Sequence, residues 1–172
     1  MMNDRLKSIS LLLLDVDGVL TTGTVTYNDD GQETKVFDVR DGLGIRMLME
    51  AGLQVGIVTG RRSMALIHRC RNLGITIVKD GIGDKAAALE SILQETGVAA
   101  AETAFMGDDL PDLPIMRRVG VPIAVGNAHE LVKQSALVTT RAVGGRGAVR
   151  EISERILKAR GDWESLLKRL FA

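Results

Sequence analysis

Two carboxylates stand one residue apart where a short apolar run near the start of the chain ends. Leu11–Leu14 is four consecutive leucines, and Asp15 and Asp17 follow. Such a run predicts a strand buried on both faces, which places both carboxylates at the carboxyl edge of a sheet, where open α/β folds bind ligands. An aspartate there can act as a nucleophile or bind a cation, and a second one beside it can transfer a proton. The structural alternative is that the pair only ends the strand and caps a turn.

Further polar residues follow other predicted strands. They are Thr59, Gly60 and Arg61 after one apolar run, Lys85 at the start of a later helix, and Asp108 and Asp109 after another run. Carboxylate oxygens hold Mg²⁺, and hydroxyl and ammonium groups contact phosphoryl oxygens. This set at one edge favours phosphoryl transfer with a divalent cation. Taken singly, Thr59 could cap a helix, Lys85 could be solvated, and the two aspartates could form a turn.

The elements that must position these residues alternate between helical and strand patterns. We expect strands over 11–14, 54–59, 75–78, 103–106, 123–125 and 137–140, and helices over 42–50, 63–73, 85–96, 113–119 and 148–160. Strands separated by helices predict an α/β fold with a doubly wound, mostly parallel, Rossmann-like sheet, because each crossover returns right-handed across a sheet face. A chain of 172 residues has the length for one domain, 1–172, with a full core.

A β-hairpin is predicted after the first strand, at about residues 22–39. Two β-type runs, 24–27 and 35–39, flank the turn segment 28–31, and β-branched residues around a glycine-containing connection are typical of a hairpin. We expect it to form a flap beside the active edge. A calcium loop is excluded here, because an EF-hand needs a different spacing of Asp and Gly with a Glu at its last position.

Composition excludes several classes of function. Hydrophobic residues make up 45% of the chain and charged residues 26%, as in an ordinary globular protein. The 22 basic and 22 acidic side chains give a net charge of zero, so neither nucleic acid nor a membrane surface is an expected partner. The first apolar run is too short for a signal peptide or a membrane span, and we expect a cytoplasmic protein. The lone cysteine, Cys70, lies in a helical pattern and is expected to be a buried thiol.

Four segments carry a resemblance to a known family. Asp15-Val-Asp17-Gly18, Thr59-Gly60, Lys85 and Gly107-Asp108-Asp109-Leu-Pro-Asp112 resemble, in order and spacing, the four motifs of the haloacid dehalogenase superfamily of phosphohydrolases. Segments 37–46, 59–61 and 144–151 look like those of the 3-deoxy-D-manno-octulosonate 8-phosphate phosphatases in that superfamily. The resemblance covers about residues 8–160. It implies a haloacid dehalogenase-like fold without the large cap domain of many relatives, and a role in lipopolysaccharide precursor biosynthesis.

The resemblance implies a two-step hydrolysis with an aspartyl-phosphate intermediate. Asp15 would attack phosphorus, and Asp17 would protonate the leaving sugar alkoxide and then deprotonate the attacking water. Mg²⁺ would be held by the Asp15 carboxylate, the Asp17 main-chain carbonyl and Asp108. Asp109 and Asp112 would orient these ligands.

The same resemblance assigns other residues to the phosphoryl group and the substrate. Thr59 would hydrogen-bond the transferring group, and Lys85 would offset charge on it and on Asp15. The residues where the substrate contacts of the family would lie are Asp38, Arg40, Asp41, Gly42, Arg46, Gly60, Arg61, Arg69 and Lys85.

Arg61 bears on the choice of substrate. A guanidinium can bind a carboxylate with two parallel hydrogen bonds. Arg61 favours an eight-carbon sugar acid, because the similar phosphatases of nine-carbon sugar acid 9-phosphates carry an acidic residue after Thr-Gly. The alternative is that Arg61 and Arg69 belong to a solvated basic helix face.

The resemblance also implies a homotetramer, in which the hairpin and a tail segment with Gly145 and Arg146 complete the pocket of a neighbouring subunit. The apolar side chains of the hairpin that another subunit would bury are Val25, Tyr27, Val36 and Phe37. The alternative is a hairpin folded on its own sheet. The chain departs from many relatives at Thr22, where they have an aspartate. The last segment, about 162–172, is expected to form a short amphipathic helix on its own or a neighbouring subunit, with a membrane role as the alternative.

Two other classes of protein share parts of this pattern. A phosphoacceptor signalling receiver also gathers acidic residues, Thr and Lys around Mg²⁺, but normally carries its acceptor on a middle strand, whereas Asp15 ends the first. A catalytically silent, phosphatase-like regulatory domain would not need the complete set of Asp15, Asp17, Lys85 and Asp108. The pattern therefore favours an active phosphatase.

Overall fold

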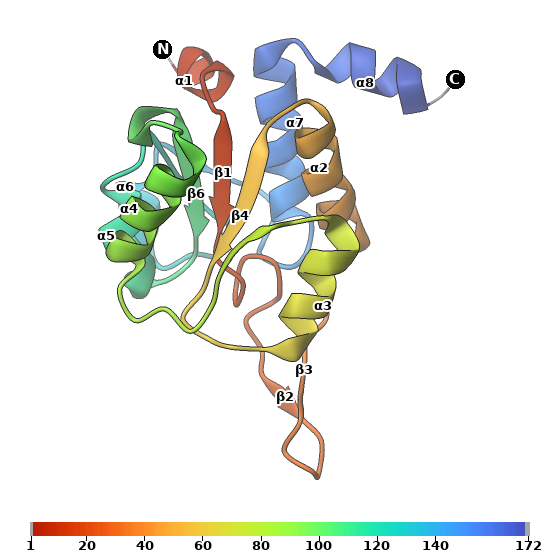
Figure 1. The fold of residues 1–172 in the computed structure, drawn as a ribbon, viewed down its shortest axis with the longest axis vertical. Coiled ribbons are helices and arrows are strands. Elements are labelled where there is room, and N and C mark those ends of the chain that lie inside the picture. Colours follow the sequence, from red (N-terminus) through yellow and green to blue (C-terminus); the bar gives the residue numbers. More distant parts are fainter. Residues whose placement is uncertain (1, 171–172) are drawn as a thin grey trace.

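A single parallel sheet forms the centre of the computed structural model, which describes residues 2–170 (Figure 1). Its strands are β1 (Leu11–Leu14), β4 (Gln54–Val58), β5 (Ile77–Lys79), β6 (Thr103–Gly107), β7 (Val121–Ala124) and β8 (Val138–Thr139). They lie in the order β5-β4-β1-β6-β7-β8, and every pairing is parallel. The doubly wound parallel sheet predicted from the sequence is confirmed.

The strand β1 lies inside the sheet, between β4 and β6. All four of its leucines are fully buried. Because helices cover both faces, the strand is apolar throughout and does not alternate. The carboxyl end of β1, with Asp15 next in the chain, therefore lies between the carboxyl ends of β4 and β6.

Helices cover both faces of the sheet (Figure 1). One face carries α2 (Val39–Glu50), α3 (Met64–Leu73) and α7 (Ala148–Arg160), and the other carries α4 (Lys85–Thr96), α5 (Leu113–Met116) and α6 (Glu130–Ser135). The helices α1 (Met2–Lys7) and α8 (Trp163–Leu170) lie at the end of the sheet away from the hairpin, and the 3₁₀ helices are η1 (Ala100–Glu102) and η2 (Leu110–Asp112). Across residues 2–170, no helix combines the length and apolar character needed to span a membrane.

The start of α4 is fixed by a side-chain cap. The Asp84 carboxylate accepts hydrogen bonds from the amides of Ala86 at 2.9 Å and Ala87 at 3.1 Å. An aspartate in this position satisfies amides that have no partner within the helix. The cap makes Lys85 the first helical residue, next to the carboxyl edge of the sheet.

The region after the hairpin turn differs from the prediction. The hairpin strands are short, β2 (Thr26–Tyr27) and β3 (Glu33–Thr34), so the strand predicted over 35–39 is wrong. The Asp38 carboxylate accepts a hydrogen bond from the amide of Arg40 at 2.7 Å, and α2 begins at Val39 instead of residue 42. An N-cap aspartate outweighs the β propensity of the neighbouring valines here.

Other differences concern short elements. The sequence analysis did not predict α1, α6 or the two 3₁₀ helices, and α5 ends at Met116 instead of residue 119. A histidine caps α6: the ring of His129 accepts a hydrogen bond from the amide of Leu131, a cap that sequence patterns rarely signal. The helix predicted for the C-terminal tail is confirmed as α8, and residues 171–172 lie outside the described chain. Cys70 is buried, as predicted.

The hairpin projects from the carboxyl end of the sheet as a separate two-stranded sheet (Figure 1). The alternative that it folds onto the main sheet is therefore wrong. Val25, Tyr27 and Val36 are 44%, 60% and 80% exposed. Phe37 differs from them, because it packs partly against the core of its own chain.

Candidate active site

The carboxyl ends of β1, β4 and β6 surround one cavity of about 360 Å³. The predicted site residues that line it are Asp15, Asp17, Thr59, Gly60, Arg61, Lys85, Asp108, Asp109 and Asp112. These residues come from segments far apart in the sequence, and the parallel sheet brings them together because its strands end at a common edge.

Lys85 crosses from α4 to two carboxylates. Its Nζ donates hydrogen bonds to Asp15 Oδ1 at 2.8 Å and to Asp112 Oδ1 at 2.6 Å, and its side chain is only 7% exposed. Burial opposes the charge of the ammonium group, but the two carboxylates outweigh it and raise the pKa of Lys85. The lysine is therefore a buried cation at the site, and the alternative of a solvated side chain is wrong.

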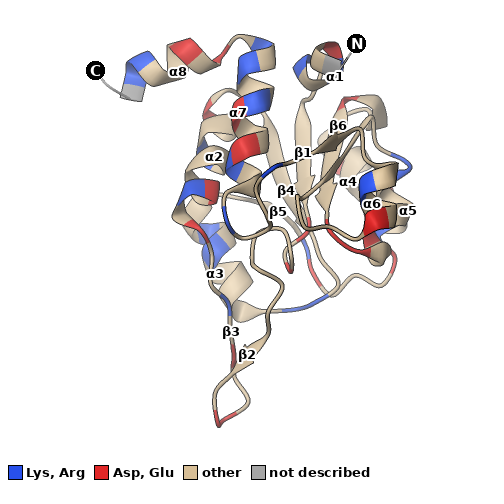
Figure 2. Ribbon diagram, turned by 180° about the vertical axis from the view of Figure 1, so that it is seen from behind, with Lys and Arg blue, Asp and Glu red and all other residues tan. Residues whose placement is uncertain are grey.

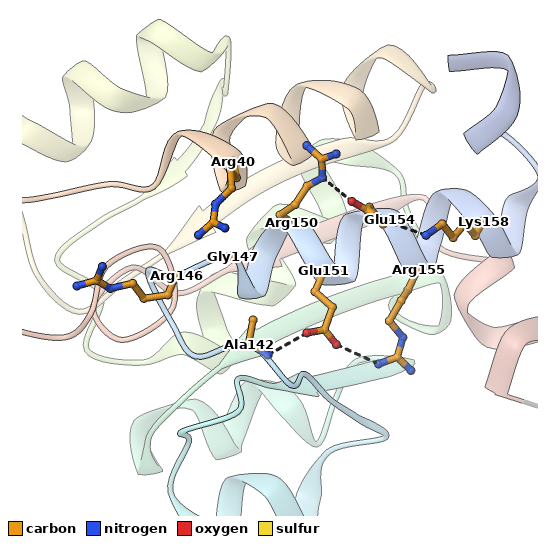
Figure 3. A pocket seen from close by; sticks show the side chains of 9 residues that line it. All are labelled: Arg40, Ala142, Arg146, Gly147, Arg150, Glu151, Glu154, Arg155 and Lys158. Atoms are coloured by element: carbon orange, nitrogen blue, oxygen red, sulfur yellow. Dashed lines mark hydrogen bonds and ion pairs between the residues drawn. The ribbon is translucent and has the colours of Figure 1, made fainter. Parts of the chain in front are cut away.

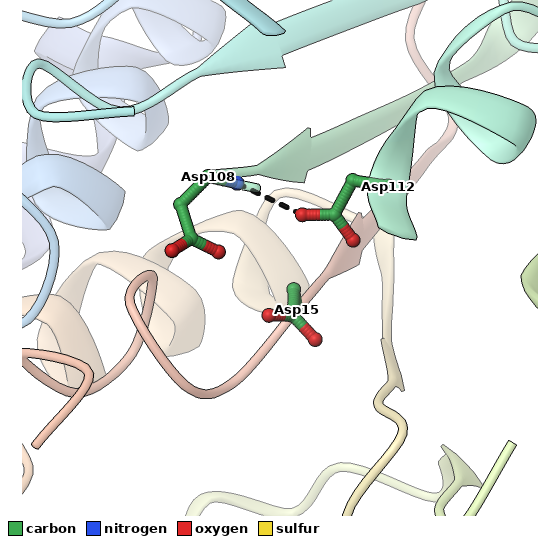
Figure 4. A group of neighbouring side chains, drawn as sticks. All are labelled: Asp15, Asp108 and Asp112. Atoms are coloured by element: carbon green, nitrogen blue, oxygen red, sulfur yellow. Dashed lines mark hydrogen bonds between the residues drawn. The ribbon is translucent and has the colours of Figure 1, made fainter. Parts of the chain in front are cut away.

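Asp112 orients the loop that follows β6. Its Oδ2 accepts hydrogen bonds from the amides of Asp108 at 2.9 Å and Asp109 at 3.3 Å (Figure 4). A Cβ on Gly107 would overlap the same oxygen, so the glycine is needed for this approach. Both carboxylate oxygens of Asp112 therefore accept hydrogen bonds within the chain, one from Lys85 and the other from backbone amides. This agrees with the predicted role of Asp112 in orienting the metal ligands.

The carboxylates of Asp15 and Asp108 fit a divalent cation. Asp15, Asp108 and Asp112 each offer an oxygen within 4.8 Å of the others, and no described residue donates a hydrogen bond to the Asp108 carboxylate (Figure 4). Burial and the charges of Asp15, Asp112 and Asp109 raise the pKa of Asp108 to about 7. Burial also raises the pKa of Asp15 to about 6, partly offset by Lys85. A hard cation such as Mg²⁺ would relieve this crowding of negative charge.

Gly18 is a residue of this site that the sequence reasoning quoted but gave no role. A Cβ there would overlap Asp108 Oδ2, and the residue has a φ of 96°. The glycine lets the loop after β1 reach the carboxylate that follows β6. The signal was available as a glycine directly after the second aspartate, because glycine marks close backbone approach.

We predict that Gly18→Ala weakens Mg²⁺ binding by at least about tenfold, because it displaces Asp108. Isothermal titration calorimetry with Mg²⁺ measures the change. Gly31→Ala is the matched control, since Gly31 also has a left-handed φ, 74°, but an added Cβ there would meet nothing within 4 Å. Equal Mg²⁺ affinity in Gly18→Ala and the control would contradict the prediction.

The raised pKa of Asp108 predicts how stability changes with pH without a metal ion. The pKa rises from 3.8 to about 7 on folding, so the folded state holds the proton more tightly than the unfolded chain. The contribution of Asp108 to the free energy of unfolding is therefore fully present below pH 3.8, and it is lost as the pH rises through about 7. In urea titrations with a chelator, we expect wild type to lose more stability than Asp108→Asn over this interval. Parallel pH profiles for the two proteins would rule this out.

Asp17 contacts the hairpin and the loop after β4. Lys35 Nζ donates a hydrogen bond to Asp17 Oδ1, and Arg61 Nε lies 3.7 Å from Asp17 Oδ2. Glu33 accepts from Arg61 at 2.5 Å. Sequence reasoning missed Lys35 and Glu33, because it treated them only as parts of a hairpin.

Thr59 is buried at the end of β4, and its Oγ1 accepts a hydrogen bond from the amide of Arg61 at 3.4 Å. It lines the cavity together with Gly60. Its contact with a phosphoryl group stays a prediction. Thr22, the departure from many relatives, exchanges a 2.9 Å hydrogen bond with Thr24 through their hydroxyl groups.

Several predicted substrate-binding residues lie outside this cavity. Arg46 donates to the carbonyl of Asn72 at 2.7 Å, and Arg69 donates to the carbonyl of Asp38 at 3.2 Å. Arg69 also lies over the Phe37 ring, 5.8 Å from its centroid. Within one chain these arginines therefore bind backbone carbonyls and an aromatic ring.

Asp41 and Gly42 have structural contacts in this chain. The buried Asp41 carboxylate accepts from the amides of Gly147 at 3.2 Å and Arg150 at 2.8 Å, which caps α7. Burial raises the pKa of Asp41, and these two amides oppose the rise. A Cβ on Gly42 would overlap the guanidinium of Arg69, so the glycine makes room for it.

Arg40 and Arg146 line a second cavity of about 380 Å³ beside α7 (Figure 3). Helix α7 carries both positive and negative side chains (Figure 2). Its Arg150 and Lys158 pair with Glu154 at 2.8 and 3.0 Å. Arg40 binds Asp38 at 2.9 Å, whereas Gly145 lines a third cavity of about 500 Å³ together with Arg146. None of these residues lines the cavity of Asp15.

The parallel sheet with an Asp, Thr, Lys and Asp set at its carboxyl edge defines a class of enzyme. The haloacid dehalogenase-like hydrolase family matches residues 74–152. That segment holds Lys85, Asp108 and Asp112, and Asp15 completes the set from β1.

Relatives narrow the class. The 3-deoxy-D-manno-octulosonate 8-phosphate phosphatase KdsC of Escherichia coli (strain K12) is 43% identical over 157 residues, which cover 91% of this chain and 84% of the relative. The crystal structure of a 3-deoxy-D-manno-octulosonate 8-phosphate phosphatase from Yersinia pestis has 42% sequence identity and a TM-score of 0.93. The match covers 95% of this chain and 88% of the Yersinia chain. The phosphatase from Moraxella catarrhalis, in complex with magnesium ion, phosphate ion and KDO, has 38% identity and a TM-score of 0.96 over 98% of this chain and 97% of that one. The chain belongs to the 3-deoxy-D-manno-octulosonate 8-phosphate phosphatase family of haloacid dehalogenase-like hydrolases.

Proposed function

We propose that this protein hydrolyses 3-deoxy-D-manno-octulosonate 8-phosphate to 3-deoxy-D-manno-octulosonate and phosphate with Mg²⁺, in lipopolysaccharide precursor biosynthesis. The observation that carries the proposal is the contact of Lys85 with Asp15 and Asp112, beside Asp108. This set lies in a chain that is 43% identical to a phosphatase of the same sugar phosphate. The magnesium ion, phosphate ion and KDO bound to the Moraxella relative support both the cation and the substrate.

In the first step, an Asp15 oxygen forms a bond to phosphorus while the bond from phosphorus to the sugar oxygen breaks. The proton of Asp17 moves to the leaving oxygen, which becomes the sugar hydroxyl. Lys85, 2.8 Å from Asp15, holds the nucleophile and offsets the charge near the phosphoryl group. Mg²⁺, held by Asp15, the Asp17 carbonyl and Asp108, would stabilise negative charge on the phosphoryl oxygens.

In the second step, a water oxygen forms a bond to phosphorus and the bond from phosphorus to Asp15 breaks. Asp17 accepts a proton from that water, so both aspartates return to their starting states and phosphate leaves. Thr59, at the cavity wall, would hydrogen-bond the phosphoryl oxygens throughout. Every residue given a role in these two steps lines the cavity.

Arg61 supports a substrate that is also a carboxylic acid. Its side chain lines the cavity and is 43% exposed. Nη2 donates to Glu33, so Nη1 is the nitrogen that would bind a carboxylate entering from solvent. The nine-carbon sugar acid 9-phosphates are the second candidate substrates, because they carry the same two charged groups.

Phosphate release from a panel of substrates tests the proposed function. The panel holds the eight-carbon and nine-carbon sugar acid phosphates, a simple sugar phosphate and an aryl phosphate, with Mg²⁺ and with chelator. We expect chelator-sensitive hydrolysis with kcat/KM at least about tenfold higher for the eight-carbon acid, equivalent to about 1.4 kcal/mol. Equal rates for all substrates would remove the substrate assignment, and no release would indicate a catalytically silent domain.

We also propose a homotetramer in which hairpins contact neighbouring subunits. The exposed Val25, Tyr27 and Val36 support this, because apolar side chains in a projecting hairpin are better buried by a second chain. The predicted substrate-binding and tail residues that do not line the cavity of Asp15 would contribute to the site of a neighbouring subunit in such an assembly. They are Asp38, Arg40, Asp41, Gly42, Arg46, Arg69, Gly145 and Arg146. Light scattering measures the mass in solution, and a monomeric mass would contradict the assembly. The cytoplasmic location stays a prediction.

A further inference from the structure

Four charged side chains form a closed ring at the base of the hairpin. Lys35 Nζ contacts Asp17 Oδ1 and lies 2.7 Å from Glu33 Oε1. Glu33 Oε2 accepts a hydrogen bond from Arg61 at 2.5 Å, and Arg61 Nε lies 3.7 Å from Asp17 Oδ2. The ring joins two hairpin residues to the loop after β1 and to the loop after β4.

Lys35 is the buried member of this ring. Its side chain is 3% exposed, against 20% for Asp17 and 43% for Arg61. A buried ammonium group is strongly unfavourable unless it is paired. The burial of Lys35 therefore depends on its two carboxylate partners, and Lys35 in turn restrains the side chain of Asp17.

The two oxygens of Asp17 have different surroundings. Oδ1 accepts the hydrogen bond from Lys35, whereas Oδ2 is buried and has no hydrogen-bond partner among the described residues. Arg61 Nε, at 3.7 Å, is too far from Oδ2 for a hydrogen bond. A buried oxygen without a hydrogen-bond partner destabilises the folded protein, unless a group of a ligand donates to it.

We propose that Lys35 is a positioning residue that holds Asp17 Oδ1 and so directs Oδ2 at the leaving-group oxygen of the substrate. This inference rests on the proposed function, in which Asp17 is the general acid. The proton on Oδ2 moves to the bridging oxygen as the bond from that oxygen to phosphorus breaks and the bond from Asp15 to phosphorus forms. The Asp17 carboxylate that remains keeps its contact with the Lys35 ammonium group.

A role through the general acid predicts a dependence on the leaving group. A sugar alkoxide is a poor leaving group that needs its proton from Asp17, whereas a nitrophenolate leaves without one. The ratio kcat/KM covers only the steps up to the first irreversible one, here the transfer to Asp15, so the later use of Asp17 as a base does not enter it. Loss of positioning therefore lowers kcat/KM for the sugar phosphate and spares the aryl phosphate.

The test compares wild type with Lys35→Met, Lys35→Arg and Lys79→Met on the eight-carbon sugar acid phosphate and on p-nitrophenyl phosphate. We expect Lys35→Met to lower kcat/KM about 100-fold for the sugar phosphate and less than about threefold for the aryl phosphate. Lys35→Arg retains a donor for Oδ1 and is expected to recover part of the loss. Lys79→Met is the control, because Lys79 pairs with Glu95 outside the cavity.

Aryl phosphate hydrolysis reports in the same assay whether each variant is folded. Equal losses for both substrates in Lys35→Met would indicate a structural role only and overturn the inference, as would unchanged rates for both. Arginine and methionine variants with the same sugar phosphate activity would also overturn it. Failure of wild type itself to hydrolyse the sugar phosphate would instead overturn the proposed function.

Discussion

Asp15→Asn will give a folded protein that releases phosphate at least about 1,000-fold more slowly than wild type, because the amide cannot act as the nucleophile. Asp15 is the residue at the end of the buried strand β1 whose Oδ1 accepts from Lys85 at 2.8 Å. The substitution nearly preserves the shape of the side chain. It also removes one of three crowded carboxylates, which offsets the loss of the contact with Lys85.

Phosphate release with Mg²⁺ measures the activity, and circular dichroism with urea titration measures the fold. Asp29→Asn is the control, since Asp29 is an exposed residue of the hairpin turn and the same chemical change there should leave turnover unaltered. Turnover of Asp15→Asn within about tenfold of wild type would exclude Asp15 as the nucleophile.

Lys85→Met will lower the free energy of unfolding by about 3 to 5 kcal/mol in the presence of chelator, because it leaves buried carboxylates without their cation. Lys85 donates to both Asp15 and Asp112, and Asp108 lies beside them. Turnover is expected to fall as well, since the charge that faces the phosphoryl group is lost.

Lys79→Met provides a matched comparison for stability. Lys79 binds Glu95 at 2.6 Å, a distance equal to that of Lys85 and Asp112, but its side chain is 26% exposed and that of Glu95 is 53% exposed. An exposed pair of this kind contributes about 0 to 1 kcal/mol. Urea titrations that gave both variants the same loss would show that the burial of Lys85 does not decide its contribution.

The central sheet and the residues at its edge were predictable from the sequence for a local reason. Apolar runs such as Leu11–Leu14 identify buried strands, and parallel strands bring their carboxyl ends together whatever lies between them. The positions of Asp15, Thr59 and Asp108 follow from that rule alone. The start of α4 at Lys85 agrees with the helix predicted over 85–96, and the structure shows that Asp84 caps it.

The hairpin and its contacts were not predictable in the same way. The β propensity of residues 35–39 was real, but the cap supplied by Asp38 decided that α2 begins there. The path of Lys35 to Asp17 spans 18 positions and depends on how the hairpin leaves the sheet, which no local pattern contains. Likewise, the partners of Asp41 lie more than 100 positions away on α7, so its role as a cap became visible only in three dimensions.

The central position of β1 has a consequence for how the molecule opens. Amide hydrogens in a strand buried between two others exchange with solvent only when much of the fold opens, whereas those of an exposed two-stranded hairpin exchange through local fluctuations. Asp15, the proposed nucleophile, directly follows β1, whereas Lys35, which donates a hydrogen bond to Asp17, belongs to the hairpin segment. The residue proposed for phosphoryl transfer and the contact that holds the proposed proton donor therefore belong to elements whose amides are expected to exchange at very different rates. We therefore expect the amides of the hairpin strands to exchange with solvent faster than those of β1.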